Sequence, residues 1–285
     1  MNAAETYAAY IDAANAQRAR IQGEQPSGDR WGGPIARRLR NAPRRELDPN
    51  LEVIASYVRP EDVLIDVGGG AGRVSLPMAM RCREVINVDP SPGMAAEFTG
   101  SAEEGGITNA RFVQAGWLEA EGIQGDVAIT SNVTYFVRDI AGFVRKMEAA
   151  ARRRVMITVW SVANPNQDLK PFQLIYGEEK AAVPGHRELL PVLWDLGILP
   201  DVRVLPGLPQ VPGGPMTAKM SQTREEAIQS VLSGNWHAPK DQARVRSRIE
   251  AHFHELFAQR PGGFHPLWRQ EARELLITWE TEGRR

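Results

Sequence analysis

Apolar and polar positions between residues 61 and 160 follow two alternating periods. Short runs rich in β-branched residues predict buried strands, and the segments between them carry apolar side chains at helical spacing. The expected strands are residues 63–67, 84–89, 108–114, 125–130 and 154–160, and the expected helices are residues 74–81, 94–104 and 139–151. Strands that alternate with helices predict a parallel sheet with helices on both faces.

The pattern is different before this stretch. Residues 3–22 are rich in alanine and predict a moderately amphipathic helix, which we expect to lie outside the sheet core. A basic helix at 35–40 and a helix at 48–59, capped by Asp48, follow. We therefore predict a helical segment at residues 1–46 and a main domain at residues 47–285.

The pattern changes again after residue 160. We expect a helical insertion at about 161–188, with a helix near 172–179, then a helix at 187–196 and a sixth strand at 201–205. A short strand at 217–221 precedes a second insertion at about 222–266, whose main element is an amphipathic helix over 241–258. The alternation of Leu275, Ile277 and Trp279 predicts a last strand added antiparallel to the sheet edge.

These elements predict an α/β fold with a doubly wound, mostly parallel sheet of seven strands. Its central feature is the turn after the first strand, where a buried apolar run leads into Asp66-Val-Gly68-Gly-Gly70-Ala-Gly72. Glycines allow positive φ angles and close approach of the backbone to a ligand, and the turn leads to a helix N-terminus. The turn therefore predicts a site for a nucleotide-type cofactor.

The spacing of this turn separates the cofactor classes. Arg73 stands where a dinucleotide fingerprint has its third glycine, and no Gly-Lys-Ser/Thr tripeptide completes a phosphate-binding loop. The pattern present is Asp66-x-Gly68-x-Gly70-x-Gly72, which resembles motif I of the class I S-adenosylmethionine-dependent methyltransferases. The resemblance implies a Rossmann-like sheet and S-adenosylmethionine as cofactor, with S-adenosylhomocysteine as product.

The resemblance also implies where the cofactor is held. Asp89 ends the second strand, where a carboxylate accepts hydrogen bonds from both ribose hydroxyls. The family usually contacts adenine with an acidic side chain after the third strand. This chain has Gly116 and Trp117 there, so a backbone N–H and a ring contact would replace the acid. In the family an N-terminal segment often covers the cofactor as a lid. The ring of Trp31 would then contact the sulfonium or the adenine, with a cap on the core as the alternative. Beyond the glycine loop, the expected cofactor residues are Asp89, Pro90, Ser91, Gly116, Trp117, Ser131 and Trp31.

The expected catalytic residues follow the fourth strand or lie in the first insertion. Asn132 and Tyr135 are the candidates for substrate contact, with a capping asparagine and a core tyrosine as the alternatives. His186 is the candidate base, with a surface loop histidine as the alternative. The family's amino-methylating branches often carry Asn/Asp-Pro-Pro-Tyr/Phe after the fourth strand. The matching stretch here, residues 131–135, lacks this motif, which argues against base or glutamine N-methylation and favours a small-molecule acceptor.

Composition and charge exclude several classes of function and location. The net charge of −1 gives no field that would recruit nucleic acid, and the arginines at positions 37, 38, 40, 44 and 45 lack interleaved aromatics. The chain has no apolar run long enough for a membrane span, no secretory signal pattern and no metal-ligand motif. The single cysteine, Cys82, favours a reducing cytoplasm and is expected in the core.

Two other functions remain open at this point. One is an NAD-dependent oxidoreductase on a similar sheet, and the other is a protein that binds the cofactor without catalysis. The sequence leaves the oligomeric state open between a monomer and a homodimer.

Overall fold

The computed structural model describes residues 2–23, 28, 29, 31–207, 221, 223–234, 237, 238 and 241–281. Seven strands form one sheet in the order β3-β2-β1-β4-β5-β9-β6. All neighbours are parallel except β9, which runs antiparallel to both β5 and β6. The strands are β1 (Val63–Val67), β2 (Glu84–Val88), β3 (Ala110–Val113), β4 (Gly125–Ser131), β5 (Ala151–Trp160), β6 (Asp201–Val204) and β9 (Glu274–Glu280).

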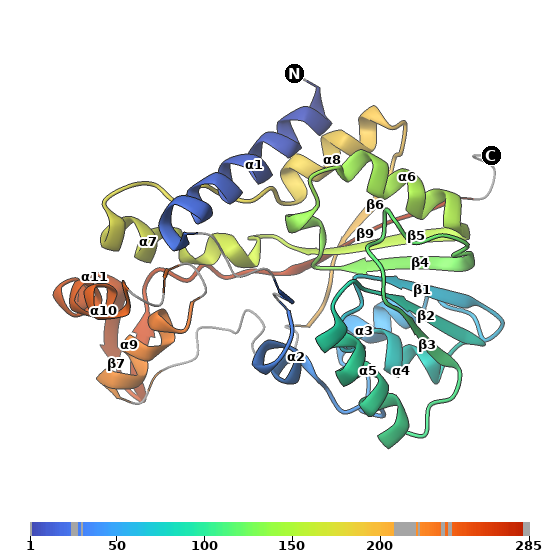
Figure 1. The fold of residues 1–285 in the computed structure, drawn as a ribbon, viewed down its shortest axis with the longest axis horizontal. Coiled ribbons are helices and arrows are strands. Elements are labelled where there is room, and N and C mark those ends of the chain that lie inside the picture. The colour runs from blue at the N-terminus through green and yellow to red at the C-terminus, as the bar shows by residue number, and fades with distance from the viewer. Residues whose placement is uncertain are drawn as a thin grey trace.

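Helices cover both faces of the sheet (Figure 1). One face carries α1 (Ala3–Gln22), α6 (Ile140–Ala150) and α8 (His186–Asp195). The other face carries α3 (Pro49–Ala55), α4 (Ser75–Ala79) and α5 (Pro92–Glu104), and α2 (Pro34–Leu39) contacts α5. The predicted α/β fold with a doubly wound, mostly parallel seven-stranded sheet is confirmed.

Each face of the sheet has its own apolar core. Val63, Ile65 and Val67 of β1 belong to the core beneath α6 and α8, whereas Leu64 belongs to the core beneath α4 and α5. All five residues of β1 are buried, which is typical of an inner strand covered on both faces. Cys82 is buried in the second core, as predicted, and burial raises the pKa of its thiol to about 11.

The N-terminal helix α1 is part of the first core. Tyr7 and Ile11 are buried among residues of the sheet and of α8, and the Tyr7 hydroxyl donates a 2.8 Å hydrogen bond to the carbonyl of Thr134. The expectation that residues 3–22 lie outside the sheet core is therefore wrong for these two side chains. The amphipathic pattern was weak because only a narrow stripe of the helix is apolar.

The last strand does not lie at the sheet edge. It pairs with β5 over seven residues, from Arg154 with Glu280 to Trp160 with Glu274, and with β6 on its other side. Residues 274–279 are all buried, which is typical of an inner strand, whereas all four residues of β6 are exposed. The antiparallel direction was predicted correctly and the edge position was wrong.

A smaller unit lies beside the sheet, with its own apolar core (Figure 1). It contains two helices and a hairpin where a single helix over 241–258 is expected from the sequence. The expectation is wrong because the apolar residues at 253, 256 and 257 also suit helical spacing. Residues 217–220 of the expected short strand lie outside the described residues, and Ser221 forms an isolated bridge with Phe264. The elements are α7 (Leu169–Tyr176), α9 (Arg224–Leu232), α10 (Gln242–Ala251), α11 (Phe253–Leu256), β7 (Phe257–Arg260) and β8 (Gly263–Pro266).

Candidate cofactor and acceptor site

The glycine turn lies between β1 and α4, at the carboxyl ends of the strands. Gly68, Gly70 and Gly72 have φ angles of 69°, 51° and 89°, in the region that favours glycine. A Cβ at Gly68 would come within 2.6 Å of Val133, and one at Gly72 within 2.7 Å of Leu76. Packing therefore requires two of these glycines, whereas a Cβ at Gly70 would meet only Met94 at 3.5 Å.

A buried carboxyl lies beneath this turn. Oδ2 of Asp66 accepts hydrogen bonds from the backbone N–H of Ser75, at 3.1 Å, and from the Ser75 hydroxyl. Burial raises the pKa of Asp66 to about 6, against the opposing effects of Ser75 and Arg73. Among the described residues, Oδ1 of Asp66 and Oδ1 of Asn87 are buried acceptors without a donor. Two such acceptors fit a cationic amine held at the turn.

The second acid, Asp89, follows β2 on the same edge of the sheet. Its two oxygens accept hydrogen bonds from the backbone N–H groups of Gly70, at 3.1 Å, and Ser91, at 2.9 Å. Burial raises the pKa of Asp89, against these two hydrogen bonds, and the charge of Asp29 raises it further. Asp89 is thus attached directly to the glycine turn, and Pro90 beside it is exposed.

The N-terminal segment reaches this corner through Asp29. Its Oδ2 accepts hydrogen bonds from the Ser91 hydroxyl, at 2.7 Å, and from the Gly93 N–H, at 2.8 Å. Trp31 packs against the small apolar cluster of Ala36, Ala71 and Met94, and its ring lies edge-on to Phe136, with ring centroids 5.6 Å apart. Asp29 and Trp31 therefore lie at this corner from outside the sheet.

A polar cluster occupies the carboxyl end of β4. Asn132 has a φ of 62° and is the one non-glycine residue with positive φ in the described chain. Its side-chain amide donates to Glu274 at 3.1 Å, and Glu274 also accepts from Asn50 at 2.9 Å. Arg73 donates to the Ser131 hydroxyl, which lies 2.7 Å from the Thr158 hydroxyl, and a 4.0 Å ion pair joins Arg73 to Glu274. The cluster thus joins the glycine turn to β9.

Tyr135 supports this cluster from below. Its hydroxyl donates to Oδ1 of Asn132 at 3.3 Å and accepts the backbone N–H of Trp160. Burial raises the pKa of Tyr135 far above its ordinary value. These contacts favour positioning of Asn132 over a role as a base, and direct contact of Tyr135 or Asn132 with a substrate stays a prediction.

Two other expected site residues lie away from the turn. Trp117 is buried in the first core, where its indole N–H donates to the carbonyl of Phe143 at 3.2 Å, so its ring has a core role in place of the expected adenine contact. The neighbouring Gly116 is half-buried, and a backbone contact there stays a prediction. His186 begins α8, and burial together with Arg187 lowers its pKa. It shares no hydrogen bond with Asn132 or Tyr135 in the part of the chain that the structure describes.

The sequence did not point to three residues of the site: Asp29, Arg73 and Glu274. At the level of sequence, Arg73 only marks the place of a missing third glycine. Glu274 is an acid at the start of a strand that is otherwise apolar, which was the one available signal. Asp29 lies in a loop, and the Ser91 and Gly93 groups that donate to it are more than 60 residues away in the chain.

The geometry defines a class of protein. A glycine turn with buried, unpaired acceptors, an acid at the end of the adjacent strand and a polar cluster after β4 form a cofactor-binding edge on a doubly wound sheet. Within the described residues, no group of three potential ligands could hold a metal ion, and no helix is long and apolar enough to span a bilayer.

Comparison with known proteins identifies a family match and a shared fold. The model of a family described as a methyltransferase domain matches residues 64–154. The YcgJ protein of Bacillus subtilis shares the fold, with a TM-score of 0.53 and 14% identity over 81% of this chain and 97% of its own. Residues 64–154 therefore match a methyltransferase domain, in agreement with the resemblance of the glycine turn, and the YcgJ structure shows the shared fold.

Two curated relatives align with parts of the chain. A ubiquinone biosynthesis O-methyltransferase of Azorhizobium caulinodans is 31% identical over 41% of this chain and 46% of its own length. The 23S rRNA uracil C5-methyltransferase RlmD of Photobacterium angustum is 38% identical over 20% of this chain and 26% of its own length. This chain thus spans less than half of either relative.

Proposed function

We propose that the protein transfers a methyl group from S-adenosylmethionine to a small-molecule acceptor by direct in-line displacement. The observation that carries this proposal is the pair of unpaired buried acceptors, Oδ1 of Asp66 and Oδ1 of Asn87, beneath the glycine turn of a methyltransferase domain. When bound, S-adenosylmethionine supplies a methyl group on a positively charged sulfur, and the bonding electron pair returns to the sulfur as a nucleophile takes the methyl.

The proposed cofactor residues act as binding and orienting groups. Asp66 faces the amino-acid end of the cofactor with negative charge, while Gly68, Gly70 and Gly72 allow the backbone to pass close to it. Asp89 accepts the ribose hydroxyls with the lone pairs left free by its two backbone hydrogen bonds. Trp31 covers the turn from outside and helps to exclude water.

On the acceptor side, Asn132 is the proposed contact residue. Its amide is held at both ends, by Glu274 and by Tyr135, so it is preorganised at the carboxyl end of β4. In-line transfer to a strong nucleophile needs positioning and water exclusion more than a base. His186 stays a proposed base for a hydroxyl or carbon acceptor only.

Other parts of the proposal concern the surroundings. We infer a division at residues 46 and 47, with the N-terminal segment acting as a lid. We also infer a cytoplasmic location, which the single buried thiol of Cys82 supports. The net charge of −1 supports a small molecule over a nucleic acid as the acceptor.

The experiment that tests the function is transfer of a labelled methyl group. The purified protein is incubated with methyl-labelled S-adenosylmethionine and separate pools of small molecules, total RNA and protein extract, and S-adenosylhomocysteine is quantified. Product formation with a small-molecule pool alone is the expected result. Cofactor binding without product in any pool would favour a non-catalytic binding protein, and product with RNA would overturn the acceptor class.

A further inference from the structure

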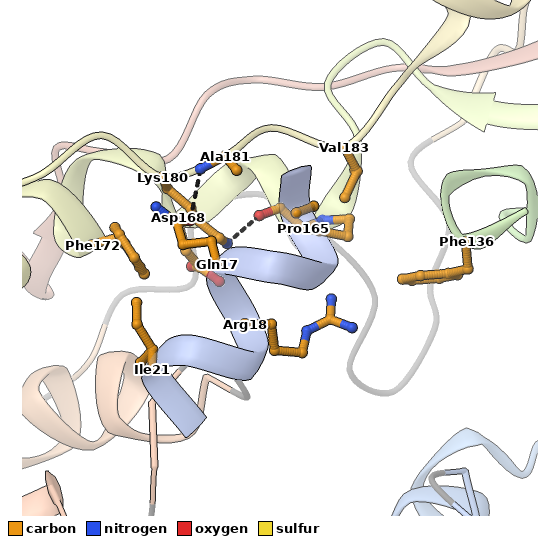
Figure 2. A pocket seen from close by; sticks show the side chains of 11 residues that line it. Gln17, Arg18, Ile21, Phe136, Pro165, Asp168, Phe172, Lys180, Ala181 and Val183 are labelled. Carbon is orange, nitrogen blue, oxygen red and sulfur yellow. Dashed lines mark hydrogen bonds between the residues drawn. The ribbon is translucent and has the colours of Figure 1, made fainter. Parts of the chain in front are cut away.

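A cavity of about 170 Å³ lies beside the candidate site, between α1 and the first insertion (Figure 2). For scale, a dry engineered cavity of about 150 Å³ holds one benzene ring. The largest apolar side chains of its lining are Ile21 of α1, Phe172 of α7 and Phe136 of the 3-10 turn η1 (Thr134–Phe136). The space therefore suits a molecule with a body of about one ring.

The cavity adjoins the cofactor edge through Phe136. This residue ends η1, which directly follows the polar cluster at β4, and its ring touches the edge of Trp31 at 5.6 Å between centroids. Trp31 in turn packs against the apolar cluster that includes Ala71 of the glycine turn. The cavity thus shares Phe136 with the ring contact that links η1 to Trp31 on the cofactor side.

The walls of the cavity are fixed by hydrogen bonds. The buried bond from Tyr7 to the Thr134 carbonyl joins α1 to η1. The Gln17 amide donates to the Glu179 carbonyl and accepts the Ala181 N–H, each at 2.8 Å, and so joins α1 to the insertion. The cavity is therefore a preformed space between two elements that are held in place.

The charges in the cavity do not balance. Its lining contains two cations, Arg18 and Lys180, and one carboxylate, Asp168. Asp168 is also close to a third cation, Arg269, just outside the lining. Lys180 donates to the Pro165 carbonyl, whereas Arg18 makes no hydrogen bond or ion pair among the described residues. Figure 2 shows the Arg18 guanidinium extending from α1 toward the end of the cavity where Phe136 lies.

Burial makes this excess of positive charge costly. Burial lowers the pKa of Arg18, and burial together with the nearby Arg18 lowers the pKa of Lys180, although Asp168 opposes the effect. Two half-buried cations that disfavour each other are stabilised by an anion between them. A carboxylate or phosphate would also accept the fork of N–H groups that Arg18 leaves unused.

We propose that this cavity binds the methyl acceptor, and that the acceptor carries an anionic group, a carboxylate or a phosphate, on a body of about one ring. The proposal rests on the methyltransferase function proposed above. Arg18 and Lys180 hold the anionic group, and Phe136, Phe172 and Ile21 contact the apolar body. Arg18 and Lys180 then set the specificity, because a neutral analogue would leave the excess positive charge of the two half-buried cations unbalanced.

The test is calorimetric titration of the full chain, saturated with S-adenosylhomocysteine, with three probes of similar size. Benzoate and phenyl phosphate carry the anion, and benzamide is the neutral control. At least one anionic probe is expected to bind about 10-fold or more tightly than benzamide, and the better of the two identifies carboxylate or phosphate. Equal binding of benzamide, or no binding of either anion at about 10 mM, would overturn the proposal.

Variants assign the effect to the cavity. Arg18→Gln and Lys180→Met should each lower the affinity for the anionic probe by about 10-fold and leave the affinity for benzamide unchanged. Arg20→Gln is the matched control, because Arg20 lies on the same helix but is exposed and paired with Glu178 outside the lining. Affinity for S-adenosylhomocysteine reports on the fold of each variant. If the wild type does not bind S-adenosylhomocysteine, the proposed function is wrong. If it does bind, but the affinity of the anionic probes is unchanged in Arg18→Gln and Lys180→Met, only the proposed acceptor class is wrong.

Discussion

Replacing Glu274 by alanine should destabilise the protein, because Glu274 is the shared acceptor of the polar cluster. Its carboxylate is 1% exposed and accepts from Asn50 at 2.9 Å and from Asn132 at 3.1 Å. The 4.0 Å ion pair with Arg73 adds less, because the Arg73 side chain is 20% exposed.

The magnitude follows from the donors that lose their partner. A buried polar group without a partner costs about 1–3 kcal/mol, and Glu274→Ala leaves two such amides. We therefore expect a loss of about 3 kcal/mol in the free energy of unfolding, since water entering the space recovers part of the cost. For a chain of this size the melting temperature should fall by roughly 6–12 °C. Glu274→Gln, which keeps one acceptor oxygen, should lose about half as much.

The assay is urea unfolding of both variants, with Glu271→Ala as a control at an exposed acid three residues earlier. That control should stay within about 0.5 kcal/mol of the wild type. A double-mutant cycle with Asn50→Ala should give a coupling of about 1 kcal/mol or more, because the two side chains are in direct contact. If Glu274→Ala were as stable as Glu271→Ala, the cluster would not be held together by this carboxylate.

Two further predictions concern the glycine turn. Since burial raises the pKa of Asp66 to about 6, its contribution to stability is greatest below about pH 4 and is lost as the pH rises through 6. Asp66→Asn should remove about 3 kcal/mol of this pH dependence between pH 4 and 7, measured by urea unfolding at each pH; an unchanged profile would contradict the burial argument. Gly68→Ala should destabilise by more than Gly122→Ala, although their φ angles are 69° and 68°, because only the Cβ at Gly68 would overlap Val133. Equal melting temperatures of these two variants would show that the φ angle alone decides the cost, about 1–2 kcal/mol.

Much of the central fold could be predicted because its signals are local. The first five strands and the glycine turn each depend on a run of about ten residues, and strand–helix alternation then fixes a parallel sheet. The order of strands depends on partners far apart in the chain, so the inner position of β9 was missed. The hairpin of β7 and β8 was missed because aromatic residues at 253 and 257 fit a helix equally well.

The site was predicted unevenly for the same reason. Asp66 lies within β1 and Asp89 directly follows β2. Because the ends of these strands meet at one edge of the sheet, the fold class predicts that the two acids lie close together. Glu274 and Asn132 are 142 residues apart, and their hydrogen bond depends on where the last strand inserts. The ring of Trp117 turned into the core because α6 supplies a carbonyl partner and an apolar surface, which no local pattern encodes.

Binding of the cofactor is the most direct test of the whole account. The purified chain would be titrated by calorimetry with S-adenosylmethionine, S-adenosylhomocysteine and NAD, and the series repeated on Asp89→Ala and on Asp201→Ala, an exposed acid on the edge strand. We predict micromolar binding of the two adenosyl ligands, none of NAD, and a loss of about 10-fold or more in affinity for Asp89→Ala only. Binding of NAD alone, or equal affinity in Asp89→Ala and the wild type, would contradict the assignment of this edge as an S-adenosylmethionine site.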